Sequence, residues 1–271
     1  MPDLASVLEQ ARVPEHSAPF MQAMSQGTAF LEGEYLFLTA DDWLMAIGYP
    51  LSGEYAHDSF ERALAAALRR VPKRLEGVDC WAIGPDLPAR LAGHVTDRDT
   101  FYILPCDAPV PARLRRPVEI AAEKLTVREG RDFTPAHRRL WAEFMNRAVL
   151  PPNVRGLFAR TGAVLDTPGL RLLDAVDAEG NLAASLLLDD APRRFCSYLI
   201  GAHSRTHYTP HAADLLFAHM SAPLEKRTKS STSASAERRH PALQDQVEAA
   251  PPCPTSWRAG GKRPARRAAK P

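Results

Sequence analysis

The alternation of helix and strand patterns predicts an α/β chain of the α+β type, in which helices flank a mixed sheet. The chain has 271 residues, of which 45% are hydrophobic, enough to bury one large core or two smaller ones. Its second half follows the order strand, two helices, three strands, helix. No apolar run reaches the roughly 18 residues that a membrane span needs. We therefore expect a cytoplasmic protein with no membrane span.

The net charge of +2 is unevenly distributed along the chain. Residues 228–271 hold nine basic and three acidic residues, whereas the preceding part is acidic on balance. This tail is rich in Ser, Pro and Arg and poor in large hydrophobic residues, so it cannot bury enough apolar surface to offset the entropy of ordering. We therefore predict an N-terminal half over 1–117, a second half over 118–227 and a disordered basic tail over 228–271.

The first half starts with a helix pattern at residues 4–11, followed by strand patterns at 35–38 and 43–49. The segment His57–Glu61 resembles a capping box with Asp58 as the cap residue, ahead of a helix with an apolar stripe. Two further strands are predicted at 80–83 and 100–104. Three prolines within 107–117 indicate a connector.

The second half starts with a strand at 124–128. Thr134-Pro135 then supplies a cap residue and a first-turn proline for a helix to residue 148, and a short helix at 154–160 follows. Strands at 170–176 and 182–188 form a hairpin around the turn at 177–181. A third strand is predicted at 195–202, and Thr209-Pro210 repeats the cap-and-proline pattern ahead of a final helix.

Three motifs lie between residues 170 and 220: DAEGNLAA at 177–184, YLIGA at 198–202 and PHAADLLF at 210–217. In this order they resemble the GNAT acyltransferase superfamily, most closely its Fem-type branch, which transfers aminoacyl or related acyl groups. The resemblance implies a GNAT-like sheet that splays beside the strand at 195–202, where an activated acyl donor would be held for transfer to an amine acceptor. A weaker likeness in residues 1–117 leaves a degenerate tandem copy open.

The turn before the final helix bears on the choice of donor. Members that use acetyl-CoA carry a glycine-rich turn there, and residues 204–210 contain no glycine. The resemblance therefore favours aminoacyl-tRNA or another activated donor, with acyl-CoA left open. Free N–H groups and the helix dipole at the helix start favour a phosphate or carboxylate. Thr209, His211 and Ala212 are accordingly candidate substrate-binding residues.

The loop before the final helix carries the catalytic candidates. His203 or His207 is suited to accept a proton from the incoming amine, because neutral imidazole is common near pH 7. Tyr208 is suited to protonate the leaving group. For the two histidines the alternative is an ordinary polar loop above the sheet, and for Tyr208 it is a side chain that only packs. The spacing of His203, His207 and His211 would form a metal face on a continuous helix, but Pro210 interrupts it, so no metal site is expected.

Three further residues are candidates for binding substrate. Asp189 and Asp190 could orient the amine, although their place before Ala191-Pro192 also fits a turn. Tyr198 lies in the strand that is expected to border the donor.

The tail begins where the family continues with another strand, a glycine turn and a helix. Reading residues 229–236 and 237–248 in shifted frames permits segments of that kind, so we favour a disrupted reading frame as the origin of the tail. The strand at 195–202 would then lack a neighbour, and activity would be lost or reduced. Two alternatives remain: a basic arm that binds nucleic acid without sequence specificity, and an inactive remnant of a transferase.

Overall fold

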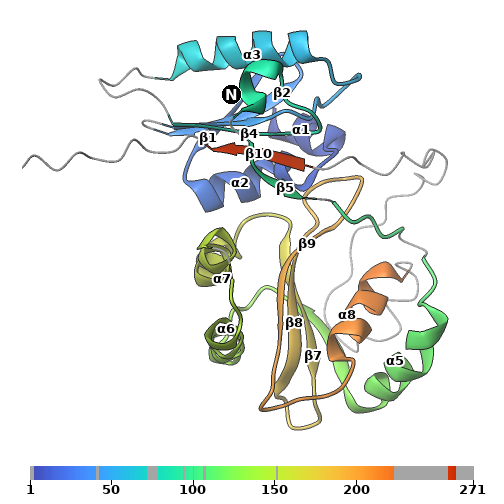
Figure 1. Ribbon diagram of the computed structural model, residues 1–271. Coiled ribbons are helices and arrows are strands. Elements are labelled where there is room, and N and C mark those ends of the chain that lie inside the picture. Colours follow the sequence, from blue (N-terminus) through green and yellow to red (C-terminus); the bar gives the residue numbers. More distant parts are fainter. Residues whose placement is uncertain are drawn as a thin grey trace, which may run out of the picture. The chain divides into compact units, whose positions relative to one another are not determined.

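The computed structural model describes residues 3–40, 43–71, 79–93, 95–99, 101–105, 108–150, 152–222 and 256–260. The chain divides into two compact units: the first combines Met1–Tyr102 with Glu248–Pro271, and the second is Ile103–Val247. Each unit contains one sheet with helices on both faces (Figure 1). The predicted fold class, sheets flanked by helices, is confirmed. No helix within the described ranges is both long and apolar enough to cross a membrane.

The first unit is built on a mixed sheet with the strand order β1-β2-β3-β4-β10-β5. Strands β3 and β4 run parallel, and every other neighbouring pair is antiparallel. Its elements are α1 (Leu4–Gln10), the 3₁₀ turn η1 (Pro14–His16), α2 (Ala18–Ser25), β1 (Thr28–Glu32), β2 (Tyr35–Ala40), β3 (Trp43–Ile47), α3 (His57–Arg70), β4 (Asp79–Gly84), α4 (Ala89–Ala92), β5 (Val95–Asp99) and β10 (Ser256–Gly260).

Strand β2 shows how the first sheet builds a core on each face. Tyr35 and Phe37 belong to the apolar cluster under α3, whereas Leu36 and Leu38 belong to the cluster under α1 and α2. This alternation follows from the two-residue side-chain period of a strand. Helix α3 covers one face and α1 and α2 cover the other (Figure 1). All four side chains are at most 2% exposed, so both faces of β2 are covered.

The start of α3 differs from the prediction. The helix begins at His57 with Ala56 as the N-cap residue, and no side chain caps it. Asp58 is therefore inside the first turn, where its carboxylate faces the positive end of the helix dipole instead of capping it. The predicted apolar stripe does face the sheet, because Phe60 and Leu64 are buried.

The last strands of the first unit also differ from the prediction. Residues 101–105 form no regular element, and β5 lies just before them. The sequence of β5, VTDRD, hides the strand from a hydrophobic pattern because three of its residues are charged. Within the tail that was predicted to be disordered, Ser256–Gly260 pair with both β4 and β5. The rest of the predicted tail, and with it the proposed basic arm, lies outside the described residues.

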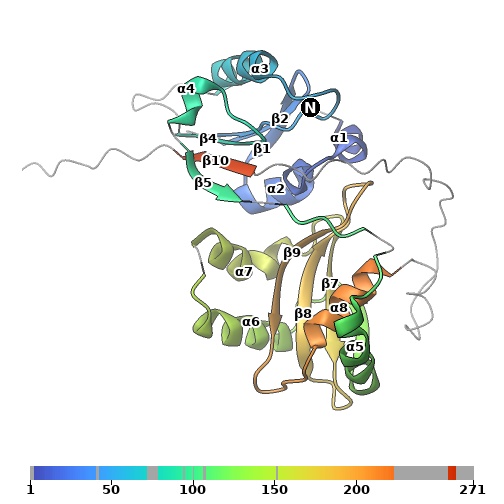
Figure 2. The ribbon, with the colours of Figure 1, turned by 45° about the vertical axis from the view of Figure 1, so that its right-hand side comes forward.

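The second unit is built on an antiparallel sheet with the order β6-β7-β8-β9. Helices α5 and α8 lie on one side of this sheet, and α6 and α7 lie on the other (Figure 2). Its elements are α5 (Ala112–Lys124), β6 (Thr126–Gly130), α6 (Pro135–Arg147), α7 (Pro152–Val164), β7 (Leu170–Val176), β8 (Leu182–Asp189), β9 (Ser197–His203) and α8 (Ala212–Ser221).

The connector predicted at 107–117 is shorter in the structure. Helix α5 begins at Ala112 and contains Pro117. The boundary between the two units lies earlier in the chain, between residues 102 and 103. Pro111 occupies the N-cap position, where its missing N–H costs nothing. Two of the three prolines thus lie at the start of the helix and inside it. A prediction based on the number of prolines alone therefore assigned the first residues of this helix to the connector.

The hairpin between β7 and β8 forms as predicted. Asp177 accepts hydrogen bonds from the backbone N–H groups of Asn181 at 2.7 Å and Glu179 at 3.1 Å. Gly180 adopts a φ of 87°, which favours glycine because it has no Cβ. The turn fixes the register of the hairpin and places Asp174 opposite Ser185.

Part of each unit has the same order of helices and strands. In the first, two helices, three antiparallel strands and a helix follow one another as α1, α2, β1, β2, β3 and α3. In the second, the same succession is α6, α7, β7, β8, β9 and α8. The first unit then continues with β4, which pairs with β3 in parallel. No described residue of the second unit provides the corresponding strand beside β9.

A buried histidine joins η1 to the rest of the first unit. The Nδ1 atom of His16 accepts a hydrogen bond from the Arg12 N–H at 3.1 Å, which leaves the proton on Nε2. Nε2 then donates to the carbonyl oxygen of Tyr49 at 3.0 Å. Desolvation lowers the pKa of His16 from 6.5 to about 4, because burial disfavours the charged imidazolium.

Acid is expected to destabilise the first unit through His16. The folded pKa of about 4 lies below the ordinary value of 6.5, so the stabilisation is complete above pH 6.5 and is lost as the pH falls toward 4. The loss amounts to about 3 kcal/mol of unfolding free energy. Urea titrations across this pH window measure it. His16→Gln should flatten the dependence, and His57→Gln, at an exposed histidine, should keep it; an unchanged slope in His16→Gln would contradict the assignment.

Candidate functional site

The candidate residues predicted from the sequence lie at two ends of the second sheet. Because β8 and β9 are antiparallel, Asp189 at the end of β8 lies opposite Ser197 at the start of β9. His203, at the end of β9, lies opposite Ala184 instead. Six strand steps separate Ser197 from His203, which corresponds to about 20 Å. The structure therefore does not bring Asp189 and Asp190 together with the loop histidines.

Both aspartates have local partners at their end of the sheet. Asp189 is 1% exposed, and its Oδ1 accepts a hydrogen bond from the Ala191 N–H at 2.9 Å, as expected for the turn alternative. Asp190 accepts a hydrogen bond from the Arg171 guanidinium, which also lies 3.4 Å from Glu129. The contact of Asp189 with Ala191 holds the turn after β8, and the contact of Asp190 with Arg171 joins that turn to β7.

Tyr198 is the second residue of β9 and lies opposite Leu188, so its backbone is at the Asp189 end of the sheet. Its ring packs edge-on against Phe217 of α8 with centroids 5.1 Å apart, and 45% of the residue remains exposed. Burial of the hydroxyl raises its pKa. A Cβ on Gly201 would lie 3.1 Å from the Tyr198 hydroxyl and 2.5 Å from Leu186. Glycine at this position therefore lets the tyrosine side chain run along the strand toward the loop.

The loop after β9 is held by a glutamate of α6 that the sequence analysis did not identify. Glu143 accepts hydrogen bonds from the Ser204 hydroxyl at 2.9 Å and from the Arg205 backbone N–H. It also lies 3.3 Å from the guanidinium of Arg147. Desolvation raises the pKa of Glu143, but the hydrogen bonds from residues 204–206 and the charge of Arg147 outweigh it, so the pKa is lowered overall. An ionised carboxylate thus anchors the loop.

Ser204 links this carboxylate to both neighbouring elements. Its backbone N–H donates to the carbonyl oxygen of Ala183 at 2.8 Å, which extends the pairing of β9 with β8. Its hydroxyl donates to Glu143 and accepts from the His207 backbone N–H at 3.0 Å. The loop backbone on which His203 and His207 lie is therefore tied to both the sheet and α6.

His203 leaves β9 in the surroundings of α6. Its ring lies 6.2 Å from that of Phe144, and its carbonyl oxygen accepts a hydrogen bond from Arg147. Desolvation, followed by the charges of Arg147 and Arg205, lowers the pKa of His203. The imidazole is therefore neutral at physiological pH and able to accept a proton.

The other loop candidates are more exposed. Tyr208 is 63% exposed, and the His211 ring lies 2.9 Å from the Asp214 carboxylate. Helix α8 begins at Ala212 with His211 as N-cap residue, so Thr209-Pro210 is not the cap that the sequence predicted. His211 adopts a φ of 64°, a left-handed conformation that histidine tolerates better than most residues. Thr209 instead contributes its carbonyl oxygen, which accepts from the Ala212 N–H at 3.3 Å.

A buried polar network lies elsewhere in the second unit. The Thr134 N–H donates to Nδ1 of His137, and Nε2 of His137 lies 3.0 Å from the Asp174 carboxylate. The Ser185 hydroxyl donates to the same carboxylate at 2.6 Å. The serine thus contacts the aspartate and not the imidazole, so this set is no nucleophilic triad. Two features of the sequence could have revealed this network: the Thr134 cap, and the hairpin register that pairs Asp174 with Ser185.

The described residues contain no group of three or more His, Cys, Asp or Glu side chains that could hold a metal ion. His203, His207 and His211 are divided among β9, the loop and the helix cap.

Comparisons with known proteins find similar solved structures, including two that cover most of this chain. No protein-family model and no curated protein matches the chain. The structure of L-PGS from Bacillus licheniformis is 13% identical, with a TM-score of 0.49 over 84% of this chain and 75% of that one. A GCN5-related N-acetyltransferase from Kribbella flavida is 12% identical, with a TM-score of 0.42 over 96% of each chain.

Removing the carboxylate anchor should open the loop. Glu143→Ala deletes the hydrogen bonds to Ser204 and Arg205, so the loop opens more often and trypsin should cleave after Arg205 about fivefold faster. Mass spectrometry of timed digests measures this one site. Glu119→Ala on α5 removes an exposed carboxylate of a surface pair and should leave the rate unchanged. Equal cleavage rates in both variants would show that the anchor does not hold the loop.

Proposed function

We propose that the second unit is the transferring half of an acyl or aminoacyl transferase, which passes an activated acyl group to an amine. The observation that supports this most is the outer edge of β9, beside which no described strand lies. An edge strand presents alternate unpaired N–H and C=O groups. These groups suit the amide or carbonyl of an acyl donor, either acyl-CoA or aminoacyl-tRNA. Of the three sequence motifs, the one at 198–202 lies on β9 itself, whereas those at 177–184 and 210–217 lie at the start of β8 and the start of α8.

The loop after β9 would supply the proton transfers. The amine nitrogen attacks the carbonyl carbon, a C–N bond forms, and the bond to the ester oxygen or thioester sulfur breaks. His203 would take the proton of the amine, and the exposed Tyr208 would give a proton to the leaving group. The lowered pKa of His203 supports this role, because it keeps the imidazole neutral at physiological pH. Thr209, His211 and Ala212, at the start of α8, would bind an anionic part of the donor.

Tyr198 is the binding candidate that best fits this site. Its side chain runs along β9 toward the loop, where its hydroxyl could hydrogen-bond a bound acyl group. Asp189 and Asp190 lie at the other end of the strand, so we do not include them in the transfer site.

The transfer site is proposed to be incomplete. In the first unit, α3 leads to β4, which pairs with β3 in parallel; the same position beside β9 is open among the described residues. A shifted reading frame after α8 would explain this difference. The resemblance implies a sheet that splays at this strand, so a restored strand would pair with only part of β9 and leave the rest of its edge for the donor. Sequencing the source gene through codons 225–250 tests for the shifted frame against an intact relative. An uninterrupted frame with no restoring insertion or deletion would reject this explanation.

Transfer can be tested on the chain as it stands and on a chain that carries the shifted-frame peptide in place of residues 229–248. Thiol release from acetyl-CoA and deacylation of alanyl-tRNA and lysyl-tRNA are measured with small primary amines as acceptors. We expect amine-dependent turnover, larger in the restored chain, and a loss of about a hundredfold or more in His203→Gln. His57→Gln is the control. Turnover that survives His203→Gln would contradict the role of His203, and no turnover in either chain would contradict the function.

A further inference from the structure

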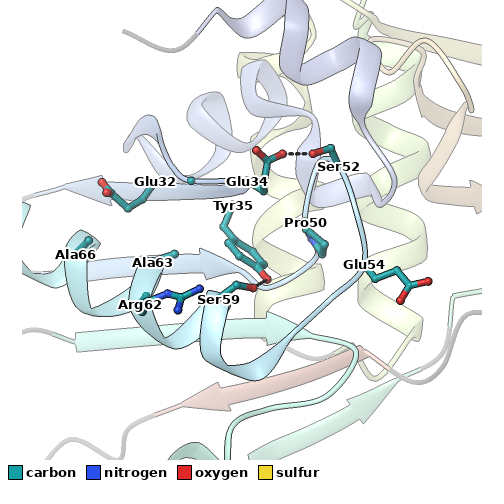
Figure 3. A pocket seen from close by; sticks show the side chains of 11 residues that line it. Glu32, Glu34, Tyr35, Pro50, Ser52, Glu54, Ser59, Arg62, Ala63 and Ala66 are labelled. Carbon is teal, nitrogen blue, oxygen red and sulfur yellow. Dashed lines mark hydrogen bonds between the residues drawn. The ribbon is translucent and has the colours of Figure 1, made fainter.

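The first unit contains a solvent-open cavity of about 410 Å³. It lies where the β1–β2 turn, residues 50–54 and the first half of α3 meet (Figure 3). Its volume is in the range of sites for small metabolites. The lining residues are Glu32, Gly33, Glu34, Tyr35, Pro50, Ser52, Glu54, Ser59, Arg62, Ala63 and Ala66. None of them belongs to the proposed transfer site.

The base of the cavity is fixed before any ligand arrives. The Tyr35 hydroxyl and the Ser59 hydroxyl share a hydrogen bond of 2.7 Å, and Tyr35 is only 2% exposed. The Tyr35 ring packs against Phe60 with centroids 5.2 Å apart. Ala63 and Ala66 are too small to fill the space above α3. A preformed base lowers the entropic cost of binding.

The charges around the cavity do not neutralise one another. Glu32 pairs with Arg70 at 2.7 Å, and Glu34 accepts a hydrogen bond from Ser52. Among the described residues, however, neither Glu34 nor Glu54 has a cationic partner, and Arg62 has no anionic one. Figure 3 shows Glu34 and Arg62 on opposite sides of the Tyr35 side chain. Glu34, Glu54 and Arg62 are thus exposed side chains that line the cavity, and no ion pair joins them within the described part of the chain.

We propose that this cavity binds a small zwitterionic compound, with its ammonium group toward Glu34 and Glu54 and its carboxylate toward Arg62. A ligand with only one charge would leave either the guanidinium or the two carboxylates unpaired. A zwitterion satisfies both sets, and charge-assisted hydrogen bonds to carboxylate are the contacts that arginine favours. The apolar base accepts the carbon chain between the two charges. This inference does not depend on the proposed transfer activity.

Three ligands with the same carbon chain separate the contributions of the two charges. ε-Aminocaproate carries both charges, n-hexylamine only the ammonium and caproate only the carboxylate. We expect ε-aminocaproate to bind the full chain about fivefold more tightly than either of the others, measured by titration calorimetry or ligand-observed NMR. Equal affinity for n-hexylamine would overturn the role of Arg62, and equal affinity for caproate would overturn that of the glutamates. Absence of saturable binding of all three would overturn the site.

Matched variants assign the contacts. Arg62→Gln should lower the affinity for ε-aminocaproate about three- to fivefold and leave that for n-hexylamine unchanged or raised. Glu34→Gln should have the converse effect, weakening n-hexylamine and sparing caproate. Arg69→Gln on the same helix and Glu9→Gln on α1 do not line the cavity and should bind like the original chain. Loss of affinity in the control variants, or none in Arg62→Gln and Glu34→Gln, would contradict the proposal.

Discussion

The pairing of β9 with β8 on one side only is the constraint on which the second unit depends. It makes β9 the outer strand of the described sheet. The proposed donor site uses the backbone groups on the other edge of this strand. The pairing with β8 also directs the chain into the loop before α8, where Ser204 extends it by one residue. The proposed transfer site combines this edge with His203 and the start of α8.

A second interaction, between Glu143 of α6 and residues 204 and 205, holds the loop after β9. The Glu143 carboxylate takes up hydrogen bonds from residues 204 and 205 and, with Arg147, forms a charged anchor at the end of α6. The same Arg147 lowers the pKa of His203, together with burial of the imidazole. Burial of the imidazole lowers its pKa most, Arg147 and Arg205 lower it further, and the Glu143 carboxylate acts in the opposite direction. A neutral imidazole held in this way fits the proposed role of His203 as a proton acceptor.

Local patterns predicted much of the fold and little of the site. The hairpin around Gly180 and the helix after Thr134 were legible because their signals lie within a few residues. The sequence placed Asp189 with the histidines because both adjoin β9 along the chain, and antiparallel pairing separates them by the length of the strand. Glu143 and the cavity around Tyr35 depend on contacts between distant elements, which no periodicity reports.

Amide hydrogen exchange along β9 tests the open edge most directly. The Ser204 N–H points toward β8, so strand alternation also directs the Ala202 N–H inward and the N–H groups of Gly201 and His203 outward. Exchange by NMR should therefore be about tenfold or more slower at Ala202 and Ser204 than at Gly201 and His203. Equal protection at all four amides would mean that the outer side of β9 is covered, and the proposed donor site would not exist.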